Sequence, residues 1–161
     1  MTNVADCAVC ALIRDGAALG RDELWRTDVA ISYVCAFDGD SVDQIAVAPL
    51  RHAASPLELS DAEFAAVLIA VRDAGIALTR VLDPDGVTLH AHVGAVEQQA
   101  AAHLEVLLGA KAFGVEFGEL PREWRQEPWV LTDAVVAGWD ETFEQRVEIV
   151  AKLRGSIAAL G

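Results

Sequence analysis

The stretch SDAEFAAVLIAVRDAGIALTRVLDPDGVTLHAHV, residues 60–93, contains the clearest local signals of the chain. It begins with Ser60 and Glu63 at the spacing of a capping box, in which the serine hydroxyl accepts a free backbone N–H and the glutamate reaches back. Apolar or small residues then recur at helical spacing: Phe64, Val67, Leu68, Val71, Gly75 and Leu78. The turn signal at residues 83–86 ends this helix, and alternation predicts a strand over residues 86–93.

The segments on either side favour an α+β domain with an antiparallel sheet. Residues 7–19 can form a short helix, residues 25–37 are rich in β-branched and aromatic residues and indicate one or two strands, and residues 45–49 form another short strand. A further strand is expected over residues 103–108, and a second amphipathic helix over residues 142–160. The apolar stripe of this second helix is Phe143, Val147, Val150, Leu153 and Ile157. This order of elements fits an antiparallel sheet better than a doubly wound parallel one.

Size and composition predict one globular domain with an acidic surface. The chain has 161 residues, of which 53% are hydrophobic and 23% charged, and its formal net charge is −13. Such a surface repels the phosphates of nucleic acids and anionic membranes. No apolar run reaches the roughly 18–20 residues of a spanning helix, and residues 1–6 lack the basic residues of a signal peptide. We expect a cytoplasmic protein that binds neither nucleic acid nor membrane.

Two of the three cysteines, Cys7 and Cys10, form a C-x-x-C motif near the N-terminus. In a cytosolic chain this spacing indicates redox chemistry, half of a metal site, or chance. A thioredoxin-like motif follows a strand inside a βαβ unit, and no strand is expected before Cys7. The metal interpretation is therefore favoured over redox chemistry. The third cysteine, Cys35, lies in an apolar run and is expected to be a buried core thiol.

The histidines offer partners for these cysteines. The chain has four: His52, His90, His92 and His103. Structural zinc takes four nitrogen or sulfur ligands in a tetrahedron, often from a C-x-x-C motif and two histidines elsewhere in the chain. Spacing alone does not choose two of the four imidazoles. Alternation places His90 and His92 together with Thr88 on one face of the strand at 86–93, and the apolar residues Val87, Leu89, Ala91 and Val93 on the other.

The order of DCAVC at 6–10, VAPLRH at 47–52, a capped helix and a strand beginning at His103 resembles the histidine-triad (HIT) family of nucleotide hydrolases and transferases. Members of that family open with a C-x-x-C segment, carry a strand of the type V-I-P-K-x-H, and end this region with an H-x-H-x-H strand. The resemblance covers about residues 6–109. If Gly94 is the family's glycine, Gln99 falls on the family's glutamine and His103 on the first triad histidine without a gap.

The triad itself is degraded, since Glu105 stands at its second position and Leu107 at its third. In the family the third histidine attacks the α-phosphorus, and leucine has no lone pair for that step. The second histidine faces phosphate oxygens, so a carboxylate there costs roughly 4 kcal/mol at about 4 Å. The resemblance leaves three ligand-binding positions: Asp38 for the ribose if one gap is allowed, His92 at the family's asparagine, and Gln99.

Zinc-containing members of the family bind the metal through the two cysteines, the histidine after P-x-x, and the first triad histidine. These positions correspond to Cys7, Cys10, His52 and His103, and all four ligand types are present. The resemblance therefore selects a zinc site from the residues that spacing left open.

Together these observations predict a zinc-containing HIT-like domain at residues 1–112, with an antiparallel sheet and one long capped helix, and a C-terminal arm and helix at 113–161 packed on the same domain. The protein would have lost the nucleotidyl-histidine nucleophile and would bind a nucleotide-like ligand or a protein partner. We also expect a homodimer through the long helix and a sheet edge, with core or dimer contacts from Trp124, Trp129 and Trp139. The alternative is a nucleotide phosphohydrolase or nucleotidyl hydrolase that uses His92, His90 and Glu105.

Overall fold

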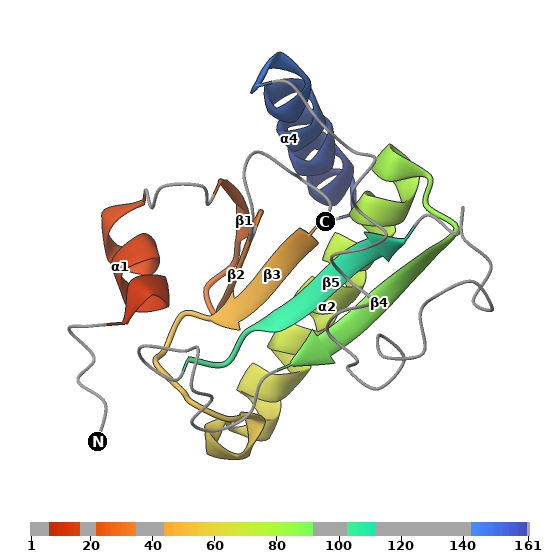
Figure 1. The fold of residues 1–161 in the computed structure, drawn as a ribbon. Helices are drawn as coiled ribbons and strands as arrows, with labels where there is room; N and C mark the ends of the chain where they lie inside the picture. The colour runs from red at the N-terminus through yellow and green to blue at the C-terminus, as the bar shows by residue number, and fades with distance from the viewer. Residues whose placement is uncertain (1–6, 17–21, 35–43, 92–102, 112–142, 161) are drawn as a thin grey trace, which may run out of the picture.

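A computed structural model describes residues 7–16, 22–34, 44–91, 103–111 and 143–160 (Figure 1). These residues form an α+β fold around one five-stranded sheet in the order β1-β2-β3-β5-β4, with every neighbouring pair antiparallel. The strands are β1 (Glu23–Arg26), β2 (Ala30–Val34), β3 (Gln44–Pro49), β4 (Gly86–Ala91) and β5 (Val106–Lys111). The helices are α1 (Ala8–Asp15), α2 (Asp61–Leu82) and α4 (Phe143–Ala158), with a short 3-10 turn η2 (Pro56–Glu58) before α2. The predicted fold class is therefore confirmed.

Several element boundaries differ from the sequence predictions. The first helix ends at Asp15, because Gly16 takes the left-handed conformation and its N–H bonds to the carbonyl of Leu12. The expected strand region at 25–37 is a hairpin of β1 and β2. His103 lies before β5, which begins only at Val106.

The long helix α2 begins as predicted. The Ser60 hydroxyl accepts the Glu63 N–H at 3.3 Å, and the Glu63 carboxylate accepts the Ser60 N–H at 2.8 Å. At the other end Asp83 takes a left-handed conformation with φ 46° and closes the helix onto Thr79. Both hydrogen bonds of the predicted capping box are thus present.

One face of the sheet packs against α2 and α4. In Figure 1, α2 lies behind the strands and α4 stands at the top of the view. The core on this face is mainly apolar and includes Val34, Ile45, Val47, Leu78, Leu108 and Leu153. Ser32 of β2 and Arg146 of α4 are buried polar residues. At Gly75 the helix approaches β5 closely, since a β-carbon there would lie 3.2 Å from Leu108 Cδ2. The sheet and the two helices are therefore in direct side-chain contact.

The buried side of α2 is rotated from the predicted stripe. Val67, Val71 and Leu78 are buried as expected, but Phe64 and Leu68 are exposed. Ala74 and Ala77 take part in the core instead. The prediction was wrong at Phe64 and Leu68 because the sheet and α4 pack against the side of α2 that carries Val67, Val71 and Ala74.

The C-terminal helix α4 shows a similar shift. Val150, Leu153 and Ile157 are buried as predicted, whereas Val147 is exposed and Arg146 is buried in its place. The Arg146 guanidinium lies 2.9 Å from Asp22 Oδ2, one residue before β1. The prediction for Val147 was wrong, because the buried side of α4 contains Arg146 and not Val147.

The edge strand β4 alternates as predicted, but its apolar residues are on the exposed side. Leu89 is 60% exposed, while Thr88 and His90 are half-buried. Leu89 pairs with Leu108, so it lies on the helix-covered face of the sheet, where it borders an open hollow together with Gly75 and Thr79 of α2. The apolar residues of β4 thus continue the exposed surface of α2.

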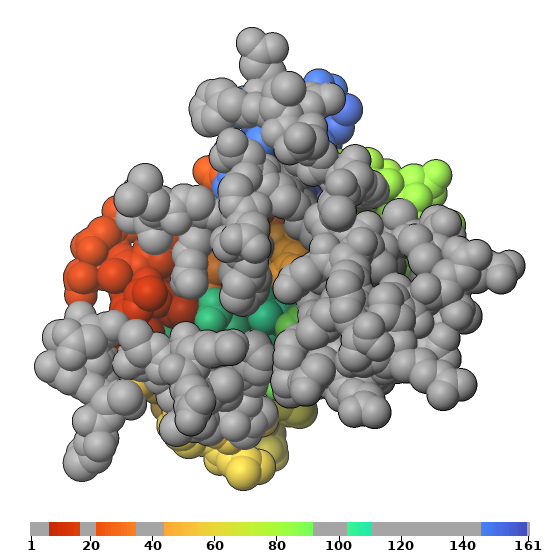
Figure 2. Space-filling model, in the orientation of Figure 1, coloured from red at the N-terminus to blue at the C-terminus, as the bar shows by residue number. Residues whose placement is uncertain are grey.

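The opposite face of the sheet packs against α1. The space-filling view in Figure 2 looks onto this face, with α1 at the left and parts of β3 and β5 near the centre. Its buried residues are Cys7, Val9, Leu12, Ile31, Tyr33, Ala46, Ala48 and Leu107. No helix among the described residues is long and apolar enough to cross a membrane.

Candidate metal centre

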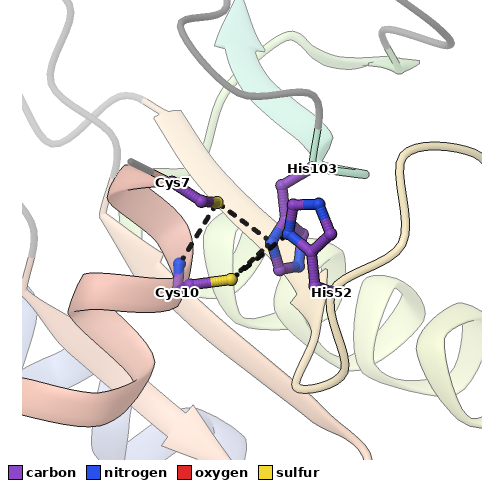
Figure 3. A group of neighbouring side chains, drawn as sticks. All are labelled: Cys7, Cys10, His52 and His103. Carbon is purple, nitrogen blue, oxygen red and sulfur yellow. Dashed lines mark hydrogen bonds between the residues drawn. The ribbon is translucent and has the colours of Figure 1, made fainter. Parts of the chain in front are cut away.

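Two cysteines at the start of α1 face two histidines that flank neighbouring strands (Figure 3). Cys7 is the N-cap residue of α1, and its sulfur accepts the N–H of Cys10 at 3.4 Å. His52 follows β3 and His103 precedes β5. Because β3 and β5 are antiparallel neighbours, the last residues of β3 and the first residues of β5 lie at the same end of the sheet. The topology thus brings together residues that are 96 positions apart.

The four side chains form a compact cluster. The Sγ atoms of Cys7 and Cys10 lie 3.4 and 3.5 Å from His103 Nδ1, and Cys10 Sγ lies 3.3 Å from His52 Nδ1. All four candidate ligand atoms lie within 4.8 Å of one another. Zinc bonds near 2.3 Å to sulfur and 2.0 Å to nitrogen, at tetrahedral angles, separate sulfur from nitrogen by about 3.5 Å. The donor types and their spacing therefore fit a tetrahedral metal ion.

His103 is held in the orientation that a metal ligand needs. Its Nε2–H donates to the carbonyl of Pro49 at 3.0 Å, which leaves the lone pair of Nδ1 directed at the two sulfurs. The backbone N–H of the next residue, Leu104, donates to the carbonyl of Ala53 at 2.6 Å. This bond ties the segment of His103 to the segment of His52, and the two imidazole rings meet edge to face at a centroid distance of 5.1 Å.

The protonation of the cluster depends on its burial. Desolvation by burial lowers the pKa of His103, which favours the neutral ring that binds metals. Burial, followed by the hydrogen bond and the charge of Cys7, raises the pKa of the Cys10 thiol to about 11. Two thiolates side by side repel each other, and a cation between them would reverse that penalty. The cluster with its cysteines deprotonated is therefore more favourable with a bound cation than without one.

A second feature of this sheet face is a bond between Tyr33 and Glu105. The Tyr33 hydroxyl donates to the Glu105 carboxylate, and the tyrosine is completely buried. Tyr33 pairs with Ala46 of β3, so its ring extends over β3 toward Glu105 on the far side of that strand. The small side chains of Ala46 and Ala48 leave room for it. Glu105 also raises the pKa of His103 as a minor electrostatic effect, so its charge acts on the cluster.

The structure places some predicted site residues and leaves others outside its described ranges. His90 lies on β4 opposite Leu107, on the face that carries the metal cluster. The proposed ligand-binding residues lie outside the described residues: Asp38, His92 and Gln99. Cys35 and the three tryptophans of the C-terminal arm also lie outside them. The predicted neighbourhood of His92 and Glu105 therefore stays a prediction.

Sequence reasoning missed Tyr33 and the carbonyl of Pro49. A buried tyrosine needs a partner for its hydroxyl, so Tyr33 in the apolar stretch AISYV was a usable signal. The partner itself depends on strand order, because Glu105 is 72 residues away. The orientation of His103 by Pro49 has no sequence signal, since any residue supplies a carbonyl.

Solved structures share this fold at low sequence identity. A Hit-like protein involved in cell-cycle regulation from Bartonella henselae is 17% identical, with a TM-score of 0.67 over 97% of this chain and 99% of that chain. A hypothetical histidine triad nucleotide-binding protein from Sulfolobus tokodaii is 17% identical, with a TM-score of 0.68 over 96% of this chain and 93% of that chain. A zinc-bound histidine triad family protein from Mycobacterium smegmatis is 14% identical, with a TM-score of 0.67 over 98% of this chain and 97% of that chain.

No protein-family model matches the chain, and a search of curated proteins finds no match either. The class that fold and site define is thus an α+β domain with a Cys2His2 cluster that could bind a metal ion. Its fold is that of HIT proteins, established by structural similarity at 14–17% identity.

Proposed function

We propose that this protein is a zinc-containing HIT-like domain that has lost the family's nucleotidyl-transfer chemistry. The observation that carries the proposal is the convergence of four suitable ligand atoms, from Cys7, Cys10, His52 and His103, within 4.8 Å. The zinc-bound structure from Mycobacterium smegmatis, which shares the fold, supports zinc as the metal.

The proposed role of zinc is structural. Four protein ligands complete a tetrahedral site and leave no open position for water or substrate. The ligands come from α1, from the segment after β3 and from the segment before β5, so the ion would hold three parts of the chain together. When bound, zinc would supply positive charge that stabilises the two thiolates.

The loss of covalent chemistry is supported by the sheet face beside the cluster. Leu107, at the position of the family's nucleophile, is buried and has no lone pair. Glu105, at the second triad position, is bound by the Tyr33 hydroxyl and repels phosphate oxygens. These residues favour a binding function, for a nucleotide-like ligand or a protein partner, over phosphoryl chemistry.

Metal analysis tests the zinc site. Protein purified from cells grown with ample zinc should contain about one zinc per chain, and Cys10→Ser and His52→Ala should each lower that content. His90→Ala is a matched control, because His90 is a histidine of the same sheet face outside the cluster. A fully folded protein without zinc would contradict the proposal.

Activity assays test the loss of chemistry. Dinucleoside polyphosphates and nucleoside phosphoramidates should be neither hydrolysed nor trapped as a covalent adduct, whereas a thermal-shift screen against mononucleotides should detect binding. Robust hydrolysis that disappears in His92→Ala would promote the alternative, a hydrolase that uses His92, His90 and Glu105. No stabilisation by any nucleotide would favour the protein-partner version of the proposal.

The partner that the exposed surface supports best is a second copy of the chain. Phe64 and Leu68 on α2 and Val87 and Leu89 on β4 are exposed large hydrophobic residues, and β4 is the last strand of the sheet. A dimer would cover these residues and pair the open edge. Sedimentation should give about twice the chain mass of 17.1 kDa, and Leu89→Asp should shift it to one chain. A wild-type protein that sediments as a monomer at micromolar concentration would contradict the dimer.

A further inference from the structure

A cavity of about 300 Å³ lies on the helix-covered face of the sheet, away from the metal cluster. It is bounded by the β1–β2 hairpin, by the outer side of α2 and by Ile157 near the end of α4. The strand residues that line it, Ala30 and Ser32, alternate with Ile31 and Tyr33, which belong to the metal-cluster face. The sheet therefore separates this cavity from the candidate zinc site.

Exposed apolar side chains line the cavity. Trp25 is 43% exposed and Ile69 is 52% exposed, although both are large hydrophobic residues, and both line the cavity. Ala66 and Ala70 of α2 contribute small side chains that leave the space open. Exposed apolar side chains that surround a hollow mark a binding surface more often than isolated ones do. A volume near 300 Å³ is at the lower end of ligand pockets and suits a small molecule.

The charged residues that line the cavity are acidic. They are Asp28 and Asp73, and among the described residues that line it there is no lysine, arginine or histidine. Asp73 is already paired, since Arg72 Nε donates to its carboxylate at 2.8 Å. No described residue donates a hydrogen bond to the Asp28 carboxylate. Of the two, Asp28 is therefore the carboxylate without a cationic partner among the described residues.

The hairpin that carries Asp28 is fixed by its own hydrogen bonds. Thr27 Oγ1 accepts the N–H of Val29 at 3.2 Å and the N–H of Ala30 at 2.9 Å. The Ser32 hydroxyl donates to the carbonyl of Trp25 at 3.3 Å. The two hydroxyls in the lining are thus used within the hairpin. Trp25 and Asp28 are the lining residues whose indole and carboxylate could contact a ligand.

We propose that this cavity is a binding site for a small organic cation, with an ammonium or guanidinium group carried on an apolar body. An indole face attracts a cation, a carboxylate pairs with it, and the aliphatic lining covers the apolar part. The proposal is independent of the zinc site and of the proposed function, because none of the cavity residues belongs to the cluster.

A titration followed by NMR of the zinc-loaded full chain tests the site. The probes are 2-phenylethylammonium and its neutral isostere 2-phenylethanol, in about 0.15 M salt, where long-range attraction by the acidic surface is screened beyond about 8 Å. We expect saturable shifts at the Trp25 indole and at the amides of residues 66–73, with the cation binding about tenfold more tightly than the isostere.

Three variants identify the source of the preference. Asp28→Asn should remove the preference for the cation, and Trp25→Leu should weaken binding of both probes. Asp83→Asn, which removes the same charge from an exposed helix cap outside the cavity, should keep the preference. Thermal midpoints of the variants confirm that each one is folded.

Several results would overturn the proposal. One is equal binding of the two probes, and another is an equal loss of preference in Asp28→Asn and Asp83→Asn, which would reveal general surface charge. Shifts at residues outside the cavity, or no saturation within the solubility of the probes, would also overturn it. Shifts at Trp25 that grow with protein concentration without a probe would assign this surface to self-association instead.

Discussion

The two faces of the sheet use the same strands for different purposes. Toward α2 and α4, most buried side chains of the sheet are aliphatic groups such as Val47 and Leu108. Toward α1, the described residues include a thiol at Cys7, a phenol at Tyr33 and an imidazole at His103, each with a specific partner. The stability of the first face depends on the volume and the apolar area that are buried. The stability of the second face depends on specific contacts between polar atoms.

This difference indicates where substitutions should be tolerated. An aliphatic core loses free energy in proportion to the volume removed, and it relaxes around conservative changes. A cluster of ligands or a buried hydrogen bond loses its function when one partner is removed. Three tests, from the largest expected effect to the smallest, examine whether the two faces respond in these two ways, and a fourth examines a site outside both faces.

The largest effect is expected at the metal cluster. Cys7→Ser should lower the free energy of unfolding by more than about 4 kcal/mol, because the binding of structural zinc contributes directly to folding. Urea denaturation measures this loss. A chelator should destabilise the wild-type protein by a similar amount and have no further effect on Cys7→Ser. A wild-type urea midpoint that does not change with a chelator would remove the distinction between the two faces.

The helix-covered face should respond to volume alone. Leu78→Ala should cost about 2–5 kcal/mol, because Leu78 is fully buried in the core. Leu68→Ala, on the same helix but 47% exposed, should stay within about 0.5 kcal/mol. Both variants should keep the zinc content of the wild type. Equal costs at the two positions would mean that the buried side of α2 is the one predicted from its apolar periodicity.

The Tyr33–Glu105 bond offers a smaller test on the metal-cluster face. Tyr33→Phe should cost about 1–2 kcal/mol, since it removes a single donor to a partly buried carboxylate without opening a large cavity. The matched variant Tyr33→Phe with Glu105→Gln separates the bond from the charge in a double-mutant cycle. A coupling near zero would indicate that this face, like the other, depends only on packing.

The smallest effect is expected outside both faces, at the cap of α2. The hydrogen bond to Arg51, followed by those to Ser60, lowers the pKa of Glu63 from 4.5 to about 2. The folded pKa is depressed, so the stabilisation by Glu63 is fully present above pH 4.5 and is lost as the pH falls toward 2. The difference in thermal midpoint between the wild type and Glu63→Gln should therefore shrink over this range. A difference that is constant from pH 7 to pH 2.5 would contradict the role of the carboxylate.

Local sequence signals predicted much of the fold because they reflect local physics. The cap at Ser60 and the alternation of β4 depend on bonds and geometry within a few residues. Signals of this kind failed where distant elements decide. Val147 has helical spacing and is nevertheless exposed, whereas its neighbour Arg146 is buried and pairs with Asp22, 124 residues away. Leu89 is apolar and exposed because the position of α2 relative to the edge strand is a tertiary property.

The candidate site shows the same division. The residue types of the Cys2His2 set are properties of the sequence alone, and a family resemblance was enough to choose His52 and His103. The convergence of these residues depends on β3 and β5 being antiparallel neighbours, which brings segments 42 and 96 residues from the cysteines together, with all four candidate ligand atoms within 4.8 Å of one another. The tautomer of His103 and the partner of Tyr33 were also decided only by the tertiary structure. Hydrogen bonds across the sheet depend on strand order and register, and no single segment contains that information.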